Sequence, residues 1–307
     1  MYDLIIIGGG PAGAAAGIYA ARKKLKTLMI AADFGGQALA SGNIENWIGV
    51  EKMTGLEFAK MLEKHVRAQE SIEIKISEKV VTVEKISDGF DIVTDKNNNY
   101  QAKVLIIASG GHRRRLDVPG GAQFEGKGVS YCATCDAPVF KNKRVAVIGG
   151  GNAGLETAID LMPYAEKIYL INRKNFFTGD DALREKIKRF SKISAIMNAD
   201  VQKISGEKFV SGIEYLDGGD NLVKKLEVEG VFVEIGSVPN SEFVKHLVET
   251  NPKGEVIVNH KTGAASCPGV FAAGDVTDAI YKQNNVSAGD AIKAVLSAHN
   301  YLLNIKI

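Results

Sequence analysis

Short apolar runs, each followed by glycines and a stretch rich in small residues, recur along the chain. The first run, residues 3–7, leads into a glycine turn and an alanine-rich stretch that ends at Arg22. This order predicts a buried parallel strand, a tight turn and a helix. Residues 26–30 form the next apolar run, so the segment predicts a complete β-α-β unit. The same pattern returns at 144–171 and predicts a second unit.

Glycines mark both strand-to-helix turns at the spacing G-x-G-x-x-G. In the first turn the residues are Gly8, Gly10, Pro11, Ala12 and Gly13. In the second turn, between a strand at 144–148 and a helix at 152–161, they are Gly149, Gly151, Asn152, Ala153 and Gly154. Such glycines allow a tight turn and close approach of a pyrophosphate, which the helix N-terminus then faces. One motif alone can be a structural turn, but two inside complete units predict two dinucleotide sites.

The residues that follow the second strand of each unit indicate which nucleotide the unit binds. In the first unit the position directly after this strand is Ala31, and the first acidic residue is Asp33. In the second unit, after a strand at 168–171, it is Asn172, followed by Arg173 and Lys174. An acidic residue there favours the ribose of NAD, whereas basic residues suit the extra phosphate of NADP. The second unit is therefore predicted to bind NADP(H), with a solvated turn as the alternative for its basic pair.

A strand near the C-terminal end supports a flavin in the first unit. The apolar run that begins at Val270 ends in Gly274 and Asp275. A carboxylate at a strand end can accept a hydrogen bond from a ribityl or other polyol hydroxyl. Residues 288–303 form an amphipathic pattern, and the N-terminus of that predicted helix would stabilise a reduced flavin anion.

Two of the three cysteines lie in a C-x-x-C motif, Cys132 and Cys135, followed by Asp136. A zinc half-site would need a second ligand pair, and only Cys267 remains, so no metal is expected. Two inert thiols are a second alternative. A redox pair is favoured, with the flavin as electron source and Asp136 as proton donor if partial burial raises its pKa.

Length and charge narrow the class of protein. A chain of 307 residues suggests about two domains. The formal net charge of +2 provides no global basic field for nucleic acid. Neither a secretory signal nor an apolar run long enough to span a bilayer is found, so we expect a cytoplasmic protein without a membrane partner. The run 113–115, three arginines, predicts a solvated connector or, alternatively, a docking patch.

In this order the motifs resemble the low-molecular-weight thioredoxin reductases along nearly the whole chain. Besides the glycine turns and the C-x-x-C-D motif, the landmarks are Gly35-Gly36-Gln37, Glu45-Asn46-Trp47, Gly236, Pro239-Asn240, Ala272–Val276 and Tyr281-Lys282-Gln283. The chain looks about equally like the flavoprotein component of alkyl hydroperoxide reductase, through the stretch 43–48 and the pair at 151–152. That component carries additional N-terminal thioredoxin-like domains, which we do not expect in this protein because the sequence begins directly at the predicted FAD strand.

The resemblance implies an α/β fold of two Rossmann-like FAD/NAD(P)-binding domains with a three-layer ββα architecture. A discontinuous FAD domain, 1–112 and 243–307, would enclose an NAD(P)H domain, 116–239, that carries the C-x-x-C. The family forms homodimers and its two domains rotate between two states. Cys135 would face the flavin, Cys132 would attack the disulfide of the partner protein, and Asp136 would be the acid–base residue.

The expected cofactor contacts follow from the same motifs. FAD would be bound by Gly8, Gly10, Pro11, Ala12, Gly36, Gln37, Asn46, Val81, Ala108, Gly274, Asp275, Lys282 and Gln283. The nicotinamide nucleotide would be bound by Gly149, Gly151, Asn152, Ala153, Arg173 and Lys174.

One motif departs from the family. Its NADPH motif is His-Arg-Arg with a further Arg, whereas this chain has Asn172-Arg173-Lys174 and then Thr178. We therefore expect NADPH with measurable use of NADH, to which the neutral amide of Asn172 would contribute by binding a ribose hydroxyl. The predicted function is a thioredoxin-disulfide reductase, in which electrons pass from NAD(P)H through FAD and the cysteine pair to thioredoxin or a thioredoxin-like protein. The alternatives are a peroxiredoxin-linked NADH-dependent flavoprotein reductase and a ferredoxin-dependent or ferredoxin–NADP reductase-like flavoenzyme.

Overall fold

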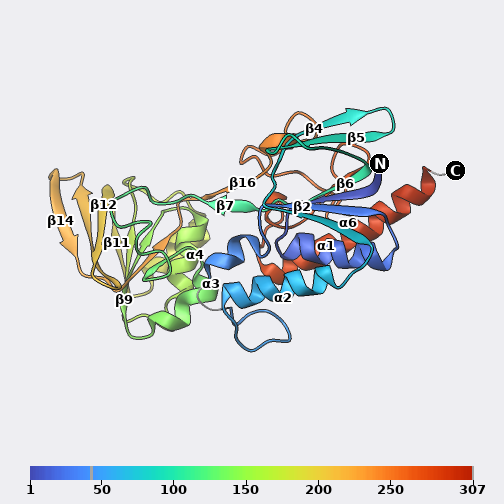
Figure 1. The fold of residues 1–307 in the computed structure, drawn as a ribbon. Coiled ribbons are helices and arrows are strands. Elements are labelled where there is room, and N and C mark those ends of the chain that lie inside the picture. Colours follow the sequence, from blue (N-terminus) through green and yellow to red (C-terminus); the bar gives the residue numbers. More distant parts are fainter. Residues whose placement is uncertain (42–43, 306–307) are drawn as a thin grey trace. The chain divides into compact units, whose positions relative to one another are not determined.

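The chain divides into two compact units in a computed structural model, which describes residues 1–41 and 44–305 (Figure 1). One unit comprises Met1–His112 and Val238–Ile307, and the other comprises Arg113–Ser237. The transitions, expected at 112–116 and 239–243, fall inside the strands β7 (Gly111–Arg113) and β16 (Ser237–Pro239), which form a two-stranded sheet. Gly42 and Asn43, the latter part of the stretch 43–48, lie outside the described residues.

The first unit is built on a seven-stranded sheet in the order β3-β2-β1-β6-β5-β4, with β17 paired to β6. The strands are β1 (Tyr2–Ile7), β2 (Thr27–Ala31), β3 (Ile72–Ile76), β4 (Val80–Ile86), β5 (Gly89–Thr94), β6 (Asn99–Ile107) and β17 (Val270–Ala272). Strands β1, β2, β3, β6 and β17 run parallel, whereas β4 and β5 are antiparallel. Because β17 comes from the C-terminal segment, this sheet is assembled from both ends of the chain.

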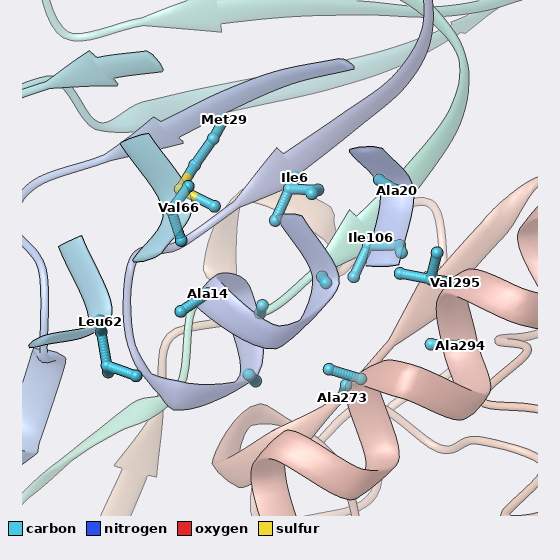
Figure 2. Packing of buried hydrophobic residues seen from close by; sticks show 14 of the residues in the cluster. Ile6, Ala14, Ala20, Met29, Leu62, Val66, Ile106, Ala273, Ala294 and Val295 are labelled. Atoms are coloured by element: carbon cyan, nitrogen blue, oxygen red, sulfur yellow. The ribbon is translucent and has the colours of Figure 1, made fainter. Parts of the chain in front are cut away.

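Alternation along the parallel strands separates two cores in this unit. Ile6, Met29 and Ile106 belong to the core shared with the helices, as Figure 2 shows. Their strand neighbours Ile5 and Leu28 belong to a second core, which includes residues of β4 and β5. Since successive side chains of a strand point to opposite faces, one continuous apolar run supplies both cores.

Three helices pack in the first of these cores: α1 (Pro11–Arg22), α2 (Gly55–Arg67) and α6 (Asn284–Asn304). Short 3₁₀ turns are η1 (Gly36–Ala40), η3 (Glu242–Val244) and η4 (Gly274–Val276). Helix α6 was expected from 288 but begins at Asn284, directly after Gln283 in an extended conformation. Its first turn has one apolar residue, Val286, among three polar ones, so the apolar pattern could not show it. Among the helices of the described residues, none has the length and apolar character to cross a membrane.

The second unit has a parallel sheet in the order β11-β10-β9-β15-β8. Its strands are β8 (Val129–Ser130), β9 (Arg144–Ile148), β10 (Lys167–Ile171), β11 (Ile193–Ile196) and β15 (Gly230–Val233). After β9 the chain continues through β10 to β11 on one side, whereas β15 lies on the other side of β9. The strand order therefore reverses at β9, which is where open α/β sheets bind ligands.

The sheet of the second unit is covered on both faces. Val145 and Val147 belong to a core with α3 (Ala133–Asp136), η2 (Ala137–Phe140), α4 (Asn152–Asp160) and α5 (Asp181–Lys188). Ala146 and Ile148 belong to a core with an antiparallel sheet of β12 (Ala199–Gly206), β13 (Val210–Asp217) and β14 (Leu222–Leu226). This is the predicted three-layer arrangement of sheet, sheet and helices.

Candidate active site and cofactor sites

The first glycine turn is shaped by backbone contacts at two of its glycines. A Cβ on Gly8 would lie 2.1 Å from the carbonyl oxygen of Ala108, and one on Gly13 would lie 1.9 Å from that of Gly8. At Gly10 the nearest atom to such a Cβ would be 4.0 Å away. Gly10 is also the N-cap of α1 and forms no side-chain cap. The turn is therefore closed within the protein but leaves space at the N-terminus of α1, where a phosphate binds most readily.

The segment around Asp275 lies beside this turn. Asp275 accepts hydrogen bonds from Nε2 of Gln37 at 3.2 Å and from Oγ of Ser287 at 3.3 Å. A Cβ on Gly274 would lie 3.2 Å from Cβ of Ala12, in the first turn of α1. Residues far apart in the sequence therefore surround the open end of α1, in the way expected of the FAD-binding residues.

The ammonium group of Lys282 is bonded to protein atoms. Its Nζ lies 3.0 Å from Oε1 of Glu255 and donates to the backbone oxygens of Asp275 and Thr277. The side chain of Lys282 is 20% exposed and that of Glu255 is 14% exposed. Lys282 thus holds the backbone around Asp275 and Thr277 in place.

Of the remaining predicted FAD residues, Asn46, Gln283 and Gly36 contact segments near the first glycine turn or α6, whereas Val81 lies elsewhere. Asn46 donates from Nδ2 to Oε1 of Gln283 at 3.2 Å, which joins the loop after η1 to the start of α6. Gly36, the first residue of η1, lies against Gly10, since a Cβ on Gly36 would be 3.6 Å from Cα of Gly10. Val81 stands apart, with an exposed side chain on the edge strand β4.

The second glycine turn has the same division of roles. A Cβ on Gly149 would lie 2.2 Å from the backbone oxygen of Glu234, and one on Gly154 would lie 2.0 Å from that of Gly149. At Gly151, the N-cap of α4, the nearest atom to such a Cβ would be Oγ1 of Thr178 at 3.8 Å. The turn therefore leaves space at the N-terminus of α4, which Asn152 and Ala153 begin.

The loop after β10 is held against this turn by hydrogen bonds. Thr178 donates its backbone N–H to the oxygen of Gly150 at 2.8 Å. Asn152 and Asp180 form two hydrogen bonds with each other. Nδ2 of Asn152 donates to Oδ2 of Asp180 at 3.0 Å, and the backbone N–H of Asp180 donates to Oδ1 of Asn152 at 2.7 Å. The amide of Asn172 is buried and donates to backbone oxygens of the loop at 174 and 176. Asn172 therefore organises the loop, and its Nδ2 is not available for a ribose hydroxyl.

The two basic residues expected at the 2′-phosphate are exposed and have protein contacts. Nε of Arg173 lies 2.7 Å from Oδ1 of Asp200. Nζ of Lys174 lies 5.4 Å from the centroid of the Phe176 ring, in a cation–π arrangement. The second oxygen of Asp200 accepts from Nε2 of Gln202 at 2.9 Å. A carboxylate thus lies at the place where a 2′-phosphate is to be recognised.

The two cysteines of the C-x-x-C motif form a disulfide, with a Cα–Cα separation of 5.4 Å. Cys132 immediately precedes α3, and Cys135 lies within it. Asp136 follows and accepts a hydrogen bond from Oγ of Ser130 at 2.6 Å. Burial raises the pKa of Asp136, and the Ser130 hydroxyl opposes this shift. A carboxyl group of raised pKa beside an oxidised cysteine pair is suited to move a proton during disulfide exchange.

Glu234 is a residue that the sequence patterns did not reveal. It follows β15 directly, is buried, and lies beside the second glycine turn. A glutamate at the end of a fully apolar strand is the one signal that the sequence offers. Its significance depends on the strand order, which places β15 next to β9.

Comparison with known proteins shows the family. Residues 2–296 match the model of the pyridine nucleotide-disulphide oxidoreductase family, and the chain belongs to it. It is 41% identical over 305 residues to the F subunit of alkyl hydroperoxide reductase of Pseudomonas aeruginosa. It is 40% identical over 302 residues to a protein named NADH dehydrogenase of Bacillus subtilis. Each match covers 98% of this chain, and the chain spans 58% and 59% of the length of these relatives.

Solved structures of thioredoxin reductases share the whole fold. The chain superposes on thioredoxin reductase from Giardia duodenalis with a TM-score of 0.92 and 32% identity, covering 98% of this chain and 99% of that one. For the enzyme from Streptococcus pyogenes the TM-score is 0.91 and the identity is 32%, with 99% of both chains covered. The fold is therefore that of the low-molecular-weight thioredoxin reductases, and the assignment as an FAD-dependent oxidoreductase that uses NAD(P)H follows from this family.

Proposed function

We propose that this protein is a thioredoxin-disulfide reductase, with NAD(P)H as electron donor and thioredoxin or a thioredoxin-like protein as the reduced product. The observation that carries the proposal is the Cys132–Cys135 disulfide with the half-buried carboxyl of Asp136 in the same short helix. The likeness to thioredoxin reductases along the full length of both chains supports this function over that of a nucleotide-binding module without a disulfide centre.

FAD fits the first unit, and when bound it supplies two-electron transfer between a nicotinamide and a disulfide. The N-terminus of α1 and the space at Gly10 are suited to its pyrophosphate, and Asp275 with Gln37 is suited to its polyol chain. The space at Gly151 and the N-terminus of α4 are suited to the pyrophosphate of the nicotinamide nucleotide.

In this proposal the cysteine pair and its neighbours carry out the exchange with the partner protein. The thiolate of Cys132 attacks the partner disulfide, and a mixed disulfide forms as one partner sulfur leaves. The thiolate of Cys135 then attacks Cys132, which releases the reduced partner. Asp136 holds the proton that the leaving thiolate needs, and Ser130 keeps its carboxyl oriented by the hydrogen bond at 2.6 Å.

Steady-state kinetics with the purified protein test this function. NADPH and NADH are each combined with thioredoxin or with an artificial electron acceptor. The expected result is FAD content near one per chain and thioredoxin reduction that Cys132→Ser and Cys135→Ser both abolish. Both variants keep transfer to the artificial acceptor, because that transfer does not need the disulfide. Thioredoxin reduction at the wild-type rate by Cys132→Ser would refute the assignment.

A second candidate function is a peroxiredoxin-linked, NADH-dependent flavoprotein reductase. Two observations favour it: the similarity to the F subunit of alkyl hydroperoxide reductase, and the pairing of Arg173 with Asp200, which weakens the case for a 2′-phosphate. The same kinetics separate the candidates when a peroxiredoxin and a separate thioredoxin-like domain are offered as acceptors. Reduction of these with NADH, without reduction of free thioredoxin, supports the second candidate.

We also propose that the protein works as a homodimer in the cytoplasm. Large apolar side chains of the first unit are exposed, among them Ile48, Ile280 and Tyr281, which are 83%, 86% and 72% exposed. Association of two copies would be favoured by the burial of such side chains. A cysteine pair that must cycle between oxidised and reduced forms fits a reducing compartment. Light scattering of the holoenzyme tests the dimer, and a monomer at micromolar concentration contradicts it.

A further inference from the structure

The side chain of Glu234 is a buried carboxyl group at the point where the strand order of the second unit reverses. This side chain is 5% exposed. The backbone N–H of Glu234 donates to the oxygen of Ile148 at 2.8 Å, which fixes it at the carboxyl end of β9. Its backbone oxygen is the atom that a Cβ on Gly149 would meet. Glu234 therefore lies at the wall of the dinucleotide crevice, and not on a remote surface.

The direction of the dinucleotide across this crevice follows from the fold. The adenosine ribose is read after the second strand of the unit, here β10 and the residues at 172–174. The pyrophosphate lies at the N-terminus of α4. The nicotinamide half must then continue to the other side of β9, which is the side of β15. Since Glu234 follows β15, it lies on the nicotinamide side.

The surroundings of Glu234 contain one cation, one hydroxyl and one further carboxylate. Nη1 of Arg113, on β7, lies 3.6 Å from Oε2 of Glu234. Thr157, buried on α4, donates to Oε1 at 3.2 Å. Glu156, also on α4, acts on it through its charge. Burial raises the pKa of Glu234 to about 7, and the charge of Glu156 adds to this shift, whereas Arg113 and Thr157 oppose it.

We propose that Glu234 is a positioning residue for the nicotinamide half of the bound nucleotide, and that nucleotide binding is coupled to uptake of a proton by its side chain. The proposal rests on the proposed function, because it assigns a role within the same nucleotide site. The physical reason is that the reduced dinucleotide, whose nicotinamide ring is uncharged, brings the negative charge of its pyrophosphate and excludes water beside a carboxyl group that is already buried. Both effects favour the neutral form. By linkage, the neutral form of Glu234 then favours the bound nucleotide.

The sign of the pH dependence follows directly. Bound nucleotide raises the pKa of Glu234 above its value of about 7 in the free protein. Protons are therefore taken up when nucleotide binds near neutral pH, and binding weakens as the pH rises above that value. The dissociation constant should rise about three- to tenfold between about pH 6 and about pH 8.5, which corresponds to a pKa displacement of about one unit or less.

Isothermal titration calorimetry of the FAD-loaded protein with tetrahydro-NADH tests this coupling. This reduced analogue has an uncharged ring and cannot transfer hydride to the flavin, and it lacks the 2′-phosphate, which itself titrates near pH ~6. Titrations in two buffers of different ionisation enthalpy give the number of protons taken up. We expect partial proton uptake by the wild-type protein near pH ~7. Glu234→Gln should bind tetrahydro-NADH as the wild type does at low pH, without uptake and without the loss of affinity at high pH.

Two further variants separate this role from general effects on the fold. Glu229→Gln makes the same chemical change at the opposite end of β15, where the side chain is exposed, and should behave as the wild type. Arg113→Gln removes the cation that stabilises the charged form, so the window of proton uptake should move to higher pH. A purely structural role for Glu234 would change stability but would not move this window.

The outcomes are distinguishable. Proton uptake that persists unchanged in Glu234→Gln, or its absence in the wild type, overturns the coupling while the proposed function stands. Failure of the FAD-loaded wild type to bind NAD⁺ or NADP⁺ overturns both the coupling and the nucleotide part of the proposed function.

Discussion

Arg173 and Asp200 form an ion pair, with 2.7 Å between Nε and Oδ1, at the end of the strand that leads to the nucleotide loop. The pair neutralises one of the two cations expected at a 2′-phosphate. Recognition of NADPH by this loop must therefore compete with an internal carboxylate. The preference for NADPH over NADH should be smaller than two free cations would produce.

Replacing Asp200 by Asn should shift this preference toward NADPH. The amide keeps the shape of the carboxyl group but leaves the charge of Arg173 unpaired. We expect the KM for NADPH to fall about three- to tenfold, as for removal of one exposed ionic competitor, with the KM for NADH unchanged. Steady-state kinetics with both nucleotides give the ratio of the two KM values directly.

Replacing Arg173 and Lys174 together by Ala should raise the KM for NADPH only. Equal effects on both nucleotides would show that the two side chains do not bind the 2′-phosphate.

Replacement by Ala should affect cofactor binding at Gly10 and the stability of the fold at Gly13. A Cβ at position 10 meets no atom closer than 4.0 Å, so Gly10→Ala should fold. The same methyl group occupies the space intended for the pyrophosphate and should lower FAD retention at least about tenfold. At position 13 the methyl group would lie 1.9 Å from the oxygen of Gly8, so Gly13→Ala should lower thermal stability itself. Thermal melts with and without added FAD distinguish the two, and identical behaviour of both variants would contradict this division of roles.

Asp136→Asn should slow disulfide reduction by about 10²-fold, because the Asn side chain cannot hold the proton.

The substitution Asp136→Asn should also stabilise the protein at alkaline pH. Burial raises the pKa of Asp136 in the folded state, so folding favours its neutral form and stability is lost as the pH rises through the folded pKa. Thermal melts from about pH 4 to about pH 9 should show a gain for Asp136→Asn that grows with pH until the folded-state pKa is passed. A loss of stability at the higher pH would contradict the direction of the shift.

Lys282→Met should destabilise the first unit and loosen the cofactor. The change leaves the partly buried carboxylate of Glu255 without its cation and frees the backbone oxygen of Asp275, at a cost of about 1.5–3 kcal/mol. Thermal unfolding and FAD release measure the two effects. Lys245→Met, which breaks the exposed pair with Glu242, is the control and should leave both unchanged. Adding Glu255→Leu to Lys282→Met should recover part of the loss, because no unpaired charge remains.

Local patterns predicted the strands beside the two glycine turns, the turns themselves and the cysteine pair, because each depends on residues close in sequence. The glycine spacing at Gly149 requires only a strand, a turn and a helix. Glu234 has no such local signature, since its environment arises from a strand pairing between β9 and β15. Asn172 was interpreted as a nucleotide ligand, yet its amide binds the following loop. Residue type alone could not decide between these partners, because both offer an oxygen acceptor.

The discontinuous first unit sets the order in which the chain can fold. The small-residue face of α1 packs with α6 (Asn284–Asn304), so this core lacks a helix until α6 has been synthesised. Residues 113–237 form a continuous unit and emerge in between. At a synthesis rate of about 5–20 residues per second, the N-terminal half of the first unit waits roughly 10–40 s with an uncovered apolar surface. The N-terminal half of the first unit is thus made before the second unit but completed after it, and it is the stretch that a chaperone would meet during translation.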